Sequence, residues 1–306
     1  MRESMSGRTR TYCRGFTLLE MLVLVAMLLV LASIFVPYLL SVREQANRAA
    51  CASNLRDVAE ALRQYAELSG NTYPRVRHDV EVDPNSWAAF TGPDDLSPFA
   101  AESSVSHNDV TAGLWLLVRL KLAKPEMFVC PSGEASPDII ADAKGKPVDV
   151  RLRGNFRSAG HLGYSYASPF TNAPGFRVDD TQESEFARMA DLNPGVGDGY
   201  DVTVVVHTDD PVRLARGNSA NHGGAGQNVL FADGHVSFHA TPFCGYGRDN
   251  IYTSLAPVPL QGETPPANGS GVLLRSMGPA WKSDSVLVPV RRLEVVKPQD
   301  TETTRP

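Results

Sequence analysis

Residues 16–40 are apolar at almost every position, and this segment limits the architectures open to the chain more than any other. Its 25 residues carry one charge, at Glu20. A helix needs about 20 apolar residues to cross the hydrocarbon core of a bilayer, so the segment can span a membrane. Four arginines and one glutamate precede it, whereas the whole chain has a formal net charge of −5. This asymmetry predicts a single-pass protein whose N-terminus is cytoplasmic and whose C-terminal part lies outside the cytoplasm.

The helical pattern continues beyond the apolar segment. Within residues 41–69, apolar side chains recur at intervals of three and four: Leu55, Val58, Ala59, Leu62, Tyr65 and Ala66. This spacing is typical of an amphipathic helix, and Gly70 is a typical stop for one. We therefore expect one continuous helix that packs against a globular domain at 70–296. A short N-terminal leader (1–15) precedes the helix, and a polar tail (297–306) ends the chain.

Two ordinary explanations of the apolar segment compete: a secretory signal that is cut after it, and a plain signal anchor. The segment is longer than the apolar region of a secretory signal, and no small-x-small cleavage site closes it. Neither explanation accounts for Glu20. A charged side chain at membrane depth costs about 2.5–3.5 kcal/mol, so such residues usually have a function.

The residues around the start of the segment resemble the processing site of type IV prepilins. They read Arg14-Gly15-Phe16-Thr17-Leu18-Leu19-Glu20. The resemblance implies that a prepilin peptidase cleaves between Gly15 and Phe16, and that Phe16 is then N-methylated. It also implies that Glu20 pairs with the N-terminal amine of a neighbouring subunit, since a carboxylate in lipid needs an opposite charge. Pro37 lies where many pilins carry a helix-kinking proline, which removes one helical hydrogen bond.

The sequence of the globular part predicts short helices and strands joined by long loops. Residues 69–106 are rich in Pro, Asp, Asn and Ser and predict loops, which Trp87 and Phe90 anchor to the core. Residues 113–122 predict a short buried helix. Residues 201–207 are β-branched nearly throughout and predict a strand, and residues 286–290 predict another.

The clearest local pattern is a hairpin around Asp233-Gly234. Asp-Gly is a preferred two-residue hairpin turn, because both central positions need positive φ. Such a turn pairs Phe231 with Val236 and Val229 with Phe238, and it places all four side chains on the core face. The predicted fold class is therefore α+β, with the long N-terminal helix packed on a C-terminal antiparallel sheet, as in pilins.

Three further elements resemble the large prepilin-like families of planctomycetes and related bacteria. The first two are Cys51-Ala-Ser-Asn54-Leu55-Arg56 and Phe128-Val-Cys-Pro-Ser. The third, from His222 to Asp233-Gly234, is similar to the H-X9-DG element of those families, although ten residues rather than nine separate the histidine from the aspartate here. Residues 135–200 show no such resemblance.

Acidic and imidazole side chains between residues 209 and 239 allow a metal site. The candidate ligands are Asp209, Asp210, His222, Asp233 and His235. Carboxylates suit Ca²⁺, whereas histidines suit transition metals. The resemblance to type II secretion pseudopilins, which bind calcium in a C-terminal loop, adds weight to Ca²⁺. The simpler expectation is structural and needs no cofactor: the turn requires Asp233, and His222 hydrogen-bonds the backbone of a glycine-rich loop.

Three cysteines follow the leader: Cys51, Cys130 and Cys244. A domain outside the cytoplasm is in an oxidising environment, which favours one disulfide. Cys51–Cys130 would tie the helix to the domain, and Cys130–Cys244 would join two parts of the domain. The sequence leaves these two pairings and three free buried thiols open.

We expect a structural protein rather than an enzyme. The sequence contains no Gly-x-Ser-x-Gly, His-Glu-x-x-His, Walker or dinucleotide-binding motif. The acidic ectodomain disfavours nucleic acid.

The expected partners are prepilin peptidase, other pilin or pseudopilin subunits and the bilayer. The expected place is the cytoplasmic (inner) membrane, with the C-terminal domain periplasmic or extracellular. The alternatives are a minor pseudopilin of type II secretion, and a membrane-tethered binding module that uses a prepilin leader for export.

Overall fold

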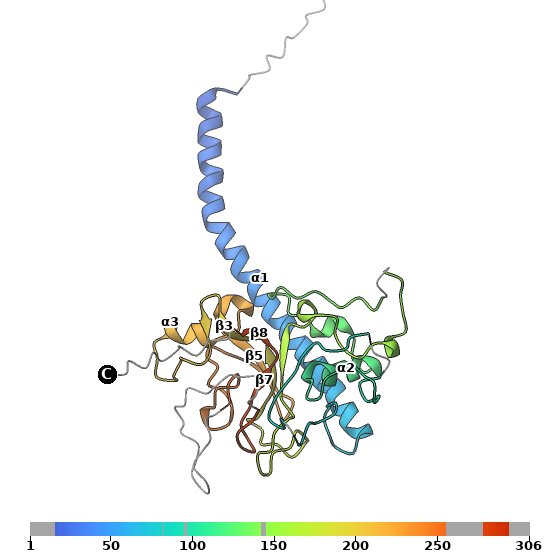
Figure 1. Cartoon of the computed structure of the whole chain (residues 1–306). Coiled ribbons are helices and arrows are strands. Elements are labelled where there is room, and N and C mark those ends of the chain that lie inside the picture. Colours follow the sequence, from blue (N-terminus) through green and yellow to red (C-terminus); the bar gives the residue numbers. More distant parts are fainter. Residues whose placement is uncertain (1–15, 82, 95–96, 142–144, 255–277, 294–306) are drawn as a thin grey trace, which may run out of the picture. The chain divides into compact units, whose positions relative to one another are not determined.

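The computed structural model describes residues 16–81, 83–94, 97–141, 145–254 and 278–293 (Figure 1). The chain divides into two compact units, with the boundary between Gln45 and Ala46. The expected leader and polar tail lie outside the described residues. The strand at 286–290 is described, and it is split between two short strands.

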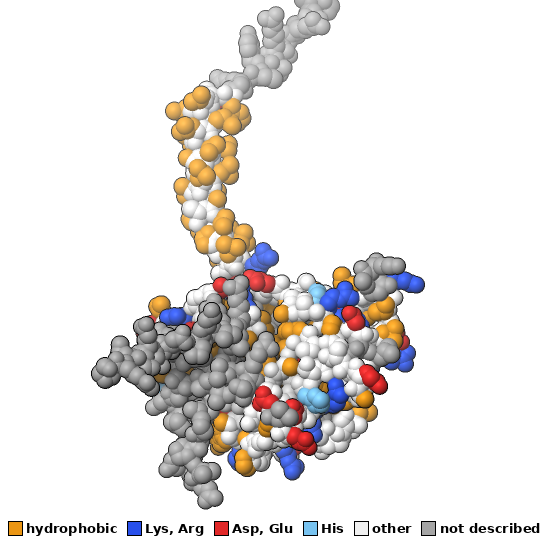
Figure 2. Space-filling model, in the orientation of Figure 1, with side chains coloured by type: hydrophobic (Ala, Val, Ile, Leu, Met, Phe, Trp, Pro, Cys, Tyr) orange, Lys and Arg blue, Asp and Glu red, His pale blue; other side chains and the backbone are white. Residues whose placement is uncertain are grey.

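The first unit is the N-terminal part of α1 (Leu18–Leu68), an uninterrupted helix of 51 residues. Pro37 lies inside it. The large apolar side chains from Leu18 to Leu40 are all exposed within the single chain, and Figure 2 shows apolar side chains along this part of the helix. Among the described residues, α1 is the one helix long and apolar enough to cross a membrane.

The second unit contains the rest of α1, whose apolar face enters a large hydrophobic core. The buried side chains are Cys51, Ala52, Leu55, Val58, Ala61, Leu62 and Ala66, at the spacing that the sequence predicts. They pack with α2 (Val110–Arg119) against one face of a sheet (Figure 1). α2 begins three residues earlier than expected, because the Asp109 carboxylate accepts a hydrogen bond from the Ala112 N–H at 2.8 Å and caps the helix.

A five-stranded antiparallel sheet forms the centre of the unit, in the order β6-β5-β2-β1-β7. Its strands are β1 (Tyr164–Ala167), β2 (Ala187–Asp191), β5 (Gln227–Phe231), β6 (Val236–His239) and β7 (Leu287–Val288). A second sheet has the order β4-β3-β8, from β3 (Asn193–Gly197), β4 (Tyr200–Asp201) and β8 (Val290–Leu293). β3 and β8 are parallel, so the second sheet is mixed.

Short helices occupy the connections. They are α3 (Pro211–Leu214) and the 3-10 turns η1 (Pro125–Phe128), η2 (Val150–Leu152), η3 (Ala159–His161), η4 (Ala215–Gly217), η5 (Asn221–Gly224) and η6 (Tyr246–Arg248). In the loop that precedes α2, Trp87 is buried and Phe90 is half-buried against the same core. These two aromatic side chains anchor the loop as expected.

Both faces of the central sheet are buried. Met189 and Leu230 face the core that contains α1, whereas their neighbours Ala190 and Val229 face a second core. This alternation follows from the two-residue period of a strand. The α+β fold class, with a long apolar N-terminal helix and a C-terminal β-sheet domain, is therefore confirmed.

The hairpin forms where expected, but its predicted register is wrong. The Phe231 N–H donates to the His235 carbonyl at 3.0 Å, so the loop has three residues, 232–234, rather than two. Within it Gly234 has φ +89°, and its N–H donates to the Phe231 carbonyl at 3.0 Å. This is a turn followed by a glycine bulge. Leu230 consequently pairs with Val236, and Val229 pairs with Ser237. Val229 and Phe231 face the second core, whereas Val236 packs against the core that contains α1, so the four side chains do not share one face.

The prediction of a strand at 201–207 is also wrong. β4 ends at Asp201, whose Oδ1 accepts hydrogen bonds from the Thr203 N–H at 3.0 Å and the Thr203 hydroxyl at 2.7 Å. An aspartate that binds the backbone two residues ahead folds the chain into a turn. This local bond outweighs the strand propensity of the following valines.

Replacing Gly226 by alanine should destabilise the hairpin strongly. Gly226 has φ +147°, and a Cβ there would lie 2.2 Å from the His239 carbonyl oxygen and 2.8 Å from the Phe238 ring. We expect a loss of about 2–3 kcal/mol in the free energy of unfolding, measured by denaturant titration of the detergent-solubilised chain. Gly160→Ala is the matched control, since its Cβ would meet only the Ser158 hydroxyl at 3.5 Å. An equal loss in both variants would contradict the steric explanation.

Candidate functional site

The predicted processing and assembly residues lie at the beginning of α1. Gly15 is outside the described residues, and Phe16 is exposed. Glu20 Oε2 accepts hydrogen bonds from the Thr17 N–H at 2.8 Å and the Thr17 hydroxyl at 2.9 Å, while the Glu20 N–H donates to Thr17 Oγ1. This is a capping box, in which the carboxylate binds a backbone donor that the helix leaves unpaired. A single chain therefore already gives Glu20 a structural role.

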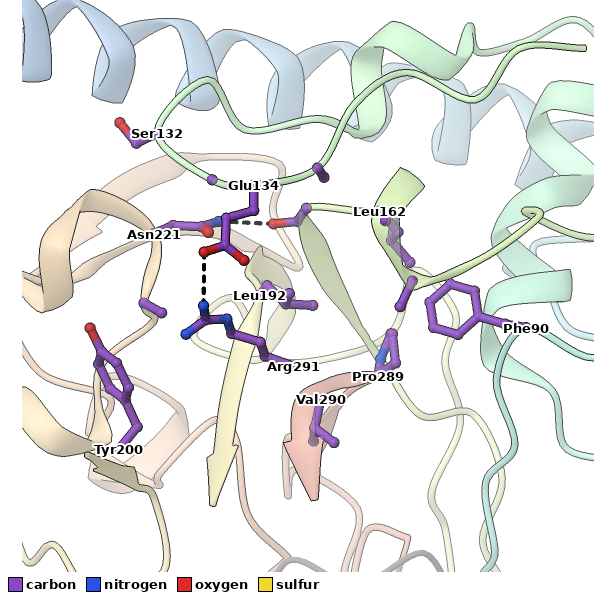
Figure 3. A pocket seen from close by; sticks show the side chains of 16 residues that line it. Phe90, Ser132, Glu134, Leu162, Leu192, Tyr200, Asn221, Pro289, Val290 and Arg291 are labelled. Carbon is purple, nitrogen blue, oxygen red and sulfur yellow. Dashed lines mark hydrogen bonds and ion pairs between the residues drawn. The ribbon is translucent and has the colours of Figure 1, made fainter. Parts of the chain in front are cut away.

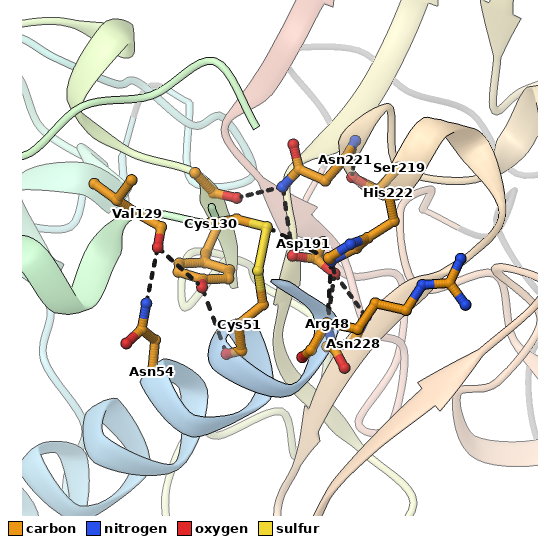
Figure 4. Close-up of a disulfide and its surroundings, with 12 residues drawn as sticks. Arg48, Cys51, Asn54, Val129, Cys130, Asp191, Ser219, Asn221, His222 and Asn228 are labelled. Carbon is orange, nitrogen blue, oxygen red and sulfur yellow. Dashed lines mark hydrogen bonds and ion pairs between the residues drawn. A yellow bond between two sulfur atoms is a disulfide. The ribbon is translucent and has the colours of Figure 1, made fainter. Parts of the chain in front are cut away.

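Four potential ligand side chains meet in the second unit. Cys51 comes from α1, Cys130 follows η1, Asp191 ends β2, and His222 lies in η5. Their ligand atoms all lie within 4.8 Å of one another, and all four residues are buried (Figure 4). Cys51 and Cys130 form a disulfide, with their Cα atoms 5.1 Å apart. This is one of the two pairings that the sequence leaves open, and Cys244 is a free thiol.

His222 and Asp191 form a buried pair beside the disulfide. His222 Nε2 lies 3.1 Å from Asp191 Oδ2 and 3.5 Å from Cys130 Sγ. The Asn228 N–H donates to Asp191 Oδ2 at 2.7 Å, and the Asn228 side-chain amide lies 3.3 Å from His222 Nε2. His222 thus binds side chains, rather than only the backbone of its own loop.

Amide side chains connect α1 to this cluster. Asn54 Nδ2 donates to the Val129 carbonyl at 2.8 Å, next to Cys130, and Asn228 Nδ2 donates to the Arg48 carbonyl at 3.4 Å (Figure 4). Three short segments that are far apart in the sequence, 51–56, 128–132 and 222–234, each contribute a residue here. Asp191 is the member that no sequence motif contains.

A cavity of about 460 Å³ lies close to the cluster (Figure 3). At one end, Arg291 pairs with Glu134 at 3.0 Å, near Tyr200 and Asn221; at the other, Phe90 and other apolar side chains line the wall. Asn221 lines the cavity and also donates to Asp191 Oδ1 at 3.4 Å. An anionic ligand entering this cavity would compete with Glu134 for Arg291.

The described structure does not gather the five candidate metal ligands. Asp209 accepts a hydrogen bond from the Val206 N–H and pairs with Arg213, and Asp210 caps α3. Asp233 and His235 pair with each other on the exposed hairpin loop. Of the five, His222 alone joins a group of three or more possible ligands among the residues described here. The acidic residues in this set therefore serve turns and helix caps.

Two other carboxylates, Asp249 and Asp284, are buried near each other. Asp249 Oδ2 accepts a hydrogen bond from the Ser285 N–H at 3.1 Å. Burial, and after it the charge of Asp284, raise the pKa of Asp249 well above its ordinary value. A carboxyl whose pKa is raised by folding stabilises the fold at low pH, and this contribution is lost as the pH rises towards the folded-state pKa.

Asp249→Asn should therefore remove part of the pH dependence of stability. We expect the variant to lose less stability than the parent between about pH 4 and pH 8, because the amide cannot ionise. Thermal unfolding at a series of pH values measures this. Asp57→Asn, on the exposed face of α1, is the control and should leave the profile unchanged. Parallel profiles for Asp249→Asn and the parent would contradict the assignment.

Comparison with known proteins gives a partial match. No family model and no solved structure matches the chain. It is 44% identical over 69 residues to "Type II secretion system core protein G" of Pectobacterium carotovorum subsp. carotovorum, which covers 22% of this chain and 44% of that protein. It is 40% identical over 69 residues to the protein of the same name from Klebsiella pneumoniae, covering 22% and 49%. The chain thus spans about half the length of the curated relatives it matches. Together with the apolar α1, these matches support a pseudopilin-like N-terminal region.

Proposed function

We propose that this chain is a pseudopilin-like structural subunit, anchored in the cytoplasmic membrane by the first half of α1 and assembled with other pilin-like subunits through the same helix. The observation that carries this proposal is α1 itself. It is a 51-residue helix with exposed apolar side chains between Leu18 and Leu40 and one carboxylate, Glu20, in its first turn. The similarity to the two type II secretion proteins supports it.

The apolar side chains of α1 from Leu18 to Leu40 are exposed in the single chain, so they need lipid or other helices around them. Leu18 is 84% exposed and Phe35 is 57% exposed, and their neighbours are similar all round the helix. A helix that is apolar on every side belongs in lipid or among other helices. Before assembly, insertion in the membrane removes this apolar surface from water. After assembly, packing against neighbouring helices does so.

Processing is the second part of the proposal. Prepilin peptidase cleaves after Gly15, and Phe16 then carries a methylated amino group. That ammonium pairs with Glu20 of a neighbouring subunit and sets the stagger between subunits. The arginines of the leader keep it cytoplasmic, so the second unit is outside the cytoplasm. The role is structural, without catalysis and without a nucleic-acid partner.

A second candidate function is a membrane-tethered binding module. The pocket beside Arg291 favours it, because a concave site with a charged end and an apolar end is typical of small-ligand sites. In that case the prepilin-like leader would serve export alone, and no assembly would follow.

Assembly in cells tests the proposal. The chain is overexpressed in its host with and without prepilin peptidase, and surface shearing is followed by sedimentation and electron microscopy. We expect high-molecular-mass material only when the peptidase is present. Material that stays monomeric in the membrane of both strains would contradict assembly and favour the binding module. Arg291→Ala should leave sedimentation unchanged, because it alters the cavity and not α1.

A further inference from the structure

We infer that Cys51, Cys130, Asp191 and His222 form a zinc site in the reduced chain, and that the disulfide takes its place on oxidation. The inference concerns the second unit and is independent of the proposed assembly role. It starts from the four ligand atoms, which lie within 4.8 Å of one another in a buried position (Figure 4).

The distances between ligand atoms suit a tetrahedral ion. Zinc binds sulfur at about 2.3 Å and nitrogen or oxygen at about 2.0–2.2 Å, which separates tetrahedral ligands by about 3.3–3.8 Å. His222 Nε2 already lies 3.1 Å from Asp191 Oδ2 and 3.5 Å from Cys130 Sγ. Once the disulfide is opened, the two sulfurs need only move apart to a similar distance. The same nitrogen atom of His222 faces both of these ligands.

The donor set selects the metal. Two thiolates, one imidazole and one carboxylate are ligands of Zn²⁺ and related transition metals, whereas Ca²⁺ prefers oxygen alone. All four side chains are buried, so water does not compete for them. The cluster therefore differs in kind from the acidic residues that the sequence offers for calcium.

Neighbouring groups hold the ligands in place. The Asn228 N–H and side-chain amide both donate to Asp191 Oδ2, at 2.7 and 3.3 Å, and Asn221 Nδ2 donates to Oδ1 at 3.4 Å. Hydrogen bonds of this kind orient carboxylate ligands and are part of a working metal site. His222 has φ +59°, so its position depends on the η5 loop as a whole.

Charge provides a reason for a cation here. In the reduced chain a carboxylate lies buried beside two thiols, and a divalent cation compensates both the carboxylate and the thiolates. Zinc would also connect four segments of the second unit where the disulfide connects two. The reduced chain would in this way keep the tie between α1 and the domain.

The exchange between the two states balances in atoms and electrons. A dithiol reductant becomes a disulfide as the Cys51–Cys130 bond takes up two electrons and two protons to give two thiols. Zn²⁺ then binds both sulfurs as thiolates, and the two protons pass to solvent. In reverse, a disulfide-type oxidant accepts two electrons from the thiolates, the Cys51–Cys130 bond re-forms, and the metal leaves.

Cobalt spectroscopy on the full chain in detergent tests the inference. The protein is reduced with a water-soluble phosphine in the absence of oxygen and metal, and is titrated with Co²⁺ and then Zn²⁺. We expect one Co²⁺ per chain, with a sulfur-to-cobalt charge-transfer band and the visible bands of tetrahedral cobalt, both abolished by Zn²⁺. The oxidised chain should show neither.

Variants identify the ligands. His222→Gln and Asp191→Asn should each weaken cobalt binding by at least about tenfold. Removing a residue that only hydrogen-bonds a metal ligand already lowers metal affinity by about 10–100-fold. His235→Gln and Cys244→Ala lie outside the cluster and should bind as the parent does. Near-ultraviolet circular dichroism of the same samples reports folding. The inference is overturned if the folded, reduced parent shows no cobalt–thiolate band, or if His222→Gln binds as tightly as the parent. It also fails if reduction removes the native dichroism and Zn²⁺ does not restore it.

Discussion

The double variant Cys51→Ala, Cys130→Ala is expected to lose about 4–5 kcal/mol of the free energy of unfolding when metal is absent. The disulfide closes a loop across a sequence separation of 79 residues. The chain-entropy model gives a stabilisation of this size for loops of roughly that length, because the cross-link restricts the unfolded chain. Both sulfurs also belong to the hydrophobic core around α1, so two buried contacts are lost.

Denaturant titration of the detergent-solubilised chain measures this loss. Cys244→Ala is the matched control, because it removes a thiol that forms no disulfide. We expect Cys244→Ala to cost only about 1 kcal/mol, because Cys244 is half-buried at the margin of the second core and forms no cross-link. If the double variant lost no more than the control, the Cys51–Cys130 bond would not be what holds α1 to the domain. Zn²⁺ should rescue the reduced parent and not the double variant, which has no sulfur ligands.

Glu20→Gln is expected to reduce the assembled fraction by at least about 100-fold. Removing one member of a buried ion pair costs about 3–5 kcal/mol, and each 1.4 kcal/mol corresponds to about tenfold. Glutamine can still accept the hydrogen bond from the Thr17 N–H, so the capping box of α1 is retained. The variant therefore removes the charge while it keeps the helix start.

Thr17→Ala makes the opposite change and separates the two roles of Glu20. It removes the hydroxyl that caps α1 and leaves the carboxylate charged. We expect most of the assembly to survive, measured by sedimentation of sheared material from cells that express each variant with the peptidase. Loss of assembly in Thr17→Ala together with full assembly in Glu20→Gln would show that Glu20 acts through the cap and not through a neighbouring amine.

Patterns that repeat along the chain predicted the fold well. The apolar side chains of residues 41–69 follow the helical period, and α1 ends at Leu68, two residues before Gly70, whose φ is +65°. The hairpin at Asp233-Gly234 was found because few residue pairs suit a tight turn. A repeated spacing of apolar residues, or a residue pair that strongly favours a turn, is enough to predict a helix or a hairpin from the local sequence.

Features that depend on a single local contact were missed. Whether the hairpin loop has two or three residues depends on where Gly234 places its positive φ, and the sequence allows both. The turn at Asp201 depends on one side-chain oxygen reaching Thr203. In both places a single hydrogen bond outweighs a propensity that the neighbouring residues share.

The sequence indicated three of the four residues of the buried cluster, but not that they lie together. Cys51, Cys130 and His222 each belong to a recognisable short sequence element, but their proximity comes from tertiary packing. Asp191 belongs to no motif, and only the structure shows that it closes a strand buried at every position. A buried acidic residue needs a partner, and the tertiary fold provides it as His222.

The mass of the mature chain shows whether prepilin peptidase processes it after Gly15. The membrane-extracted protein is measured intact and by its N-terminal peptide, from cells with and without prepilin peptidase. We expect a chain that begins at methylated Phe16 only when the peptidase is present, and at Met1 when it is absent. A chain that begins at Met1 in both strains, or that is cut beyond Leu40, would contradict it.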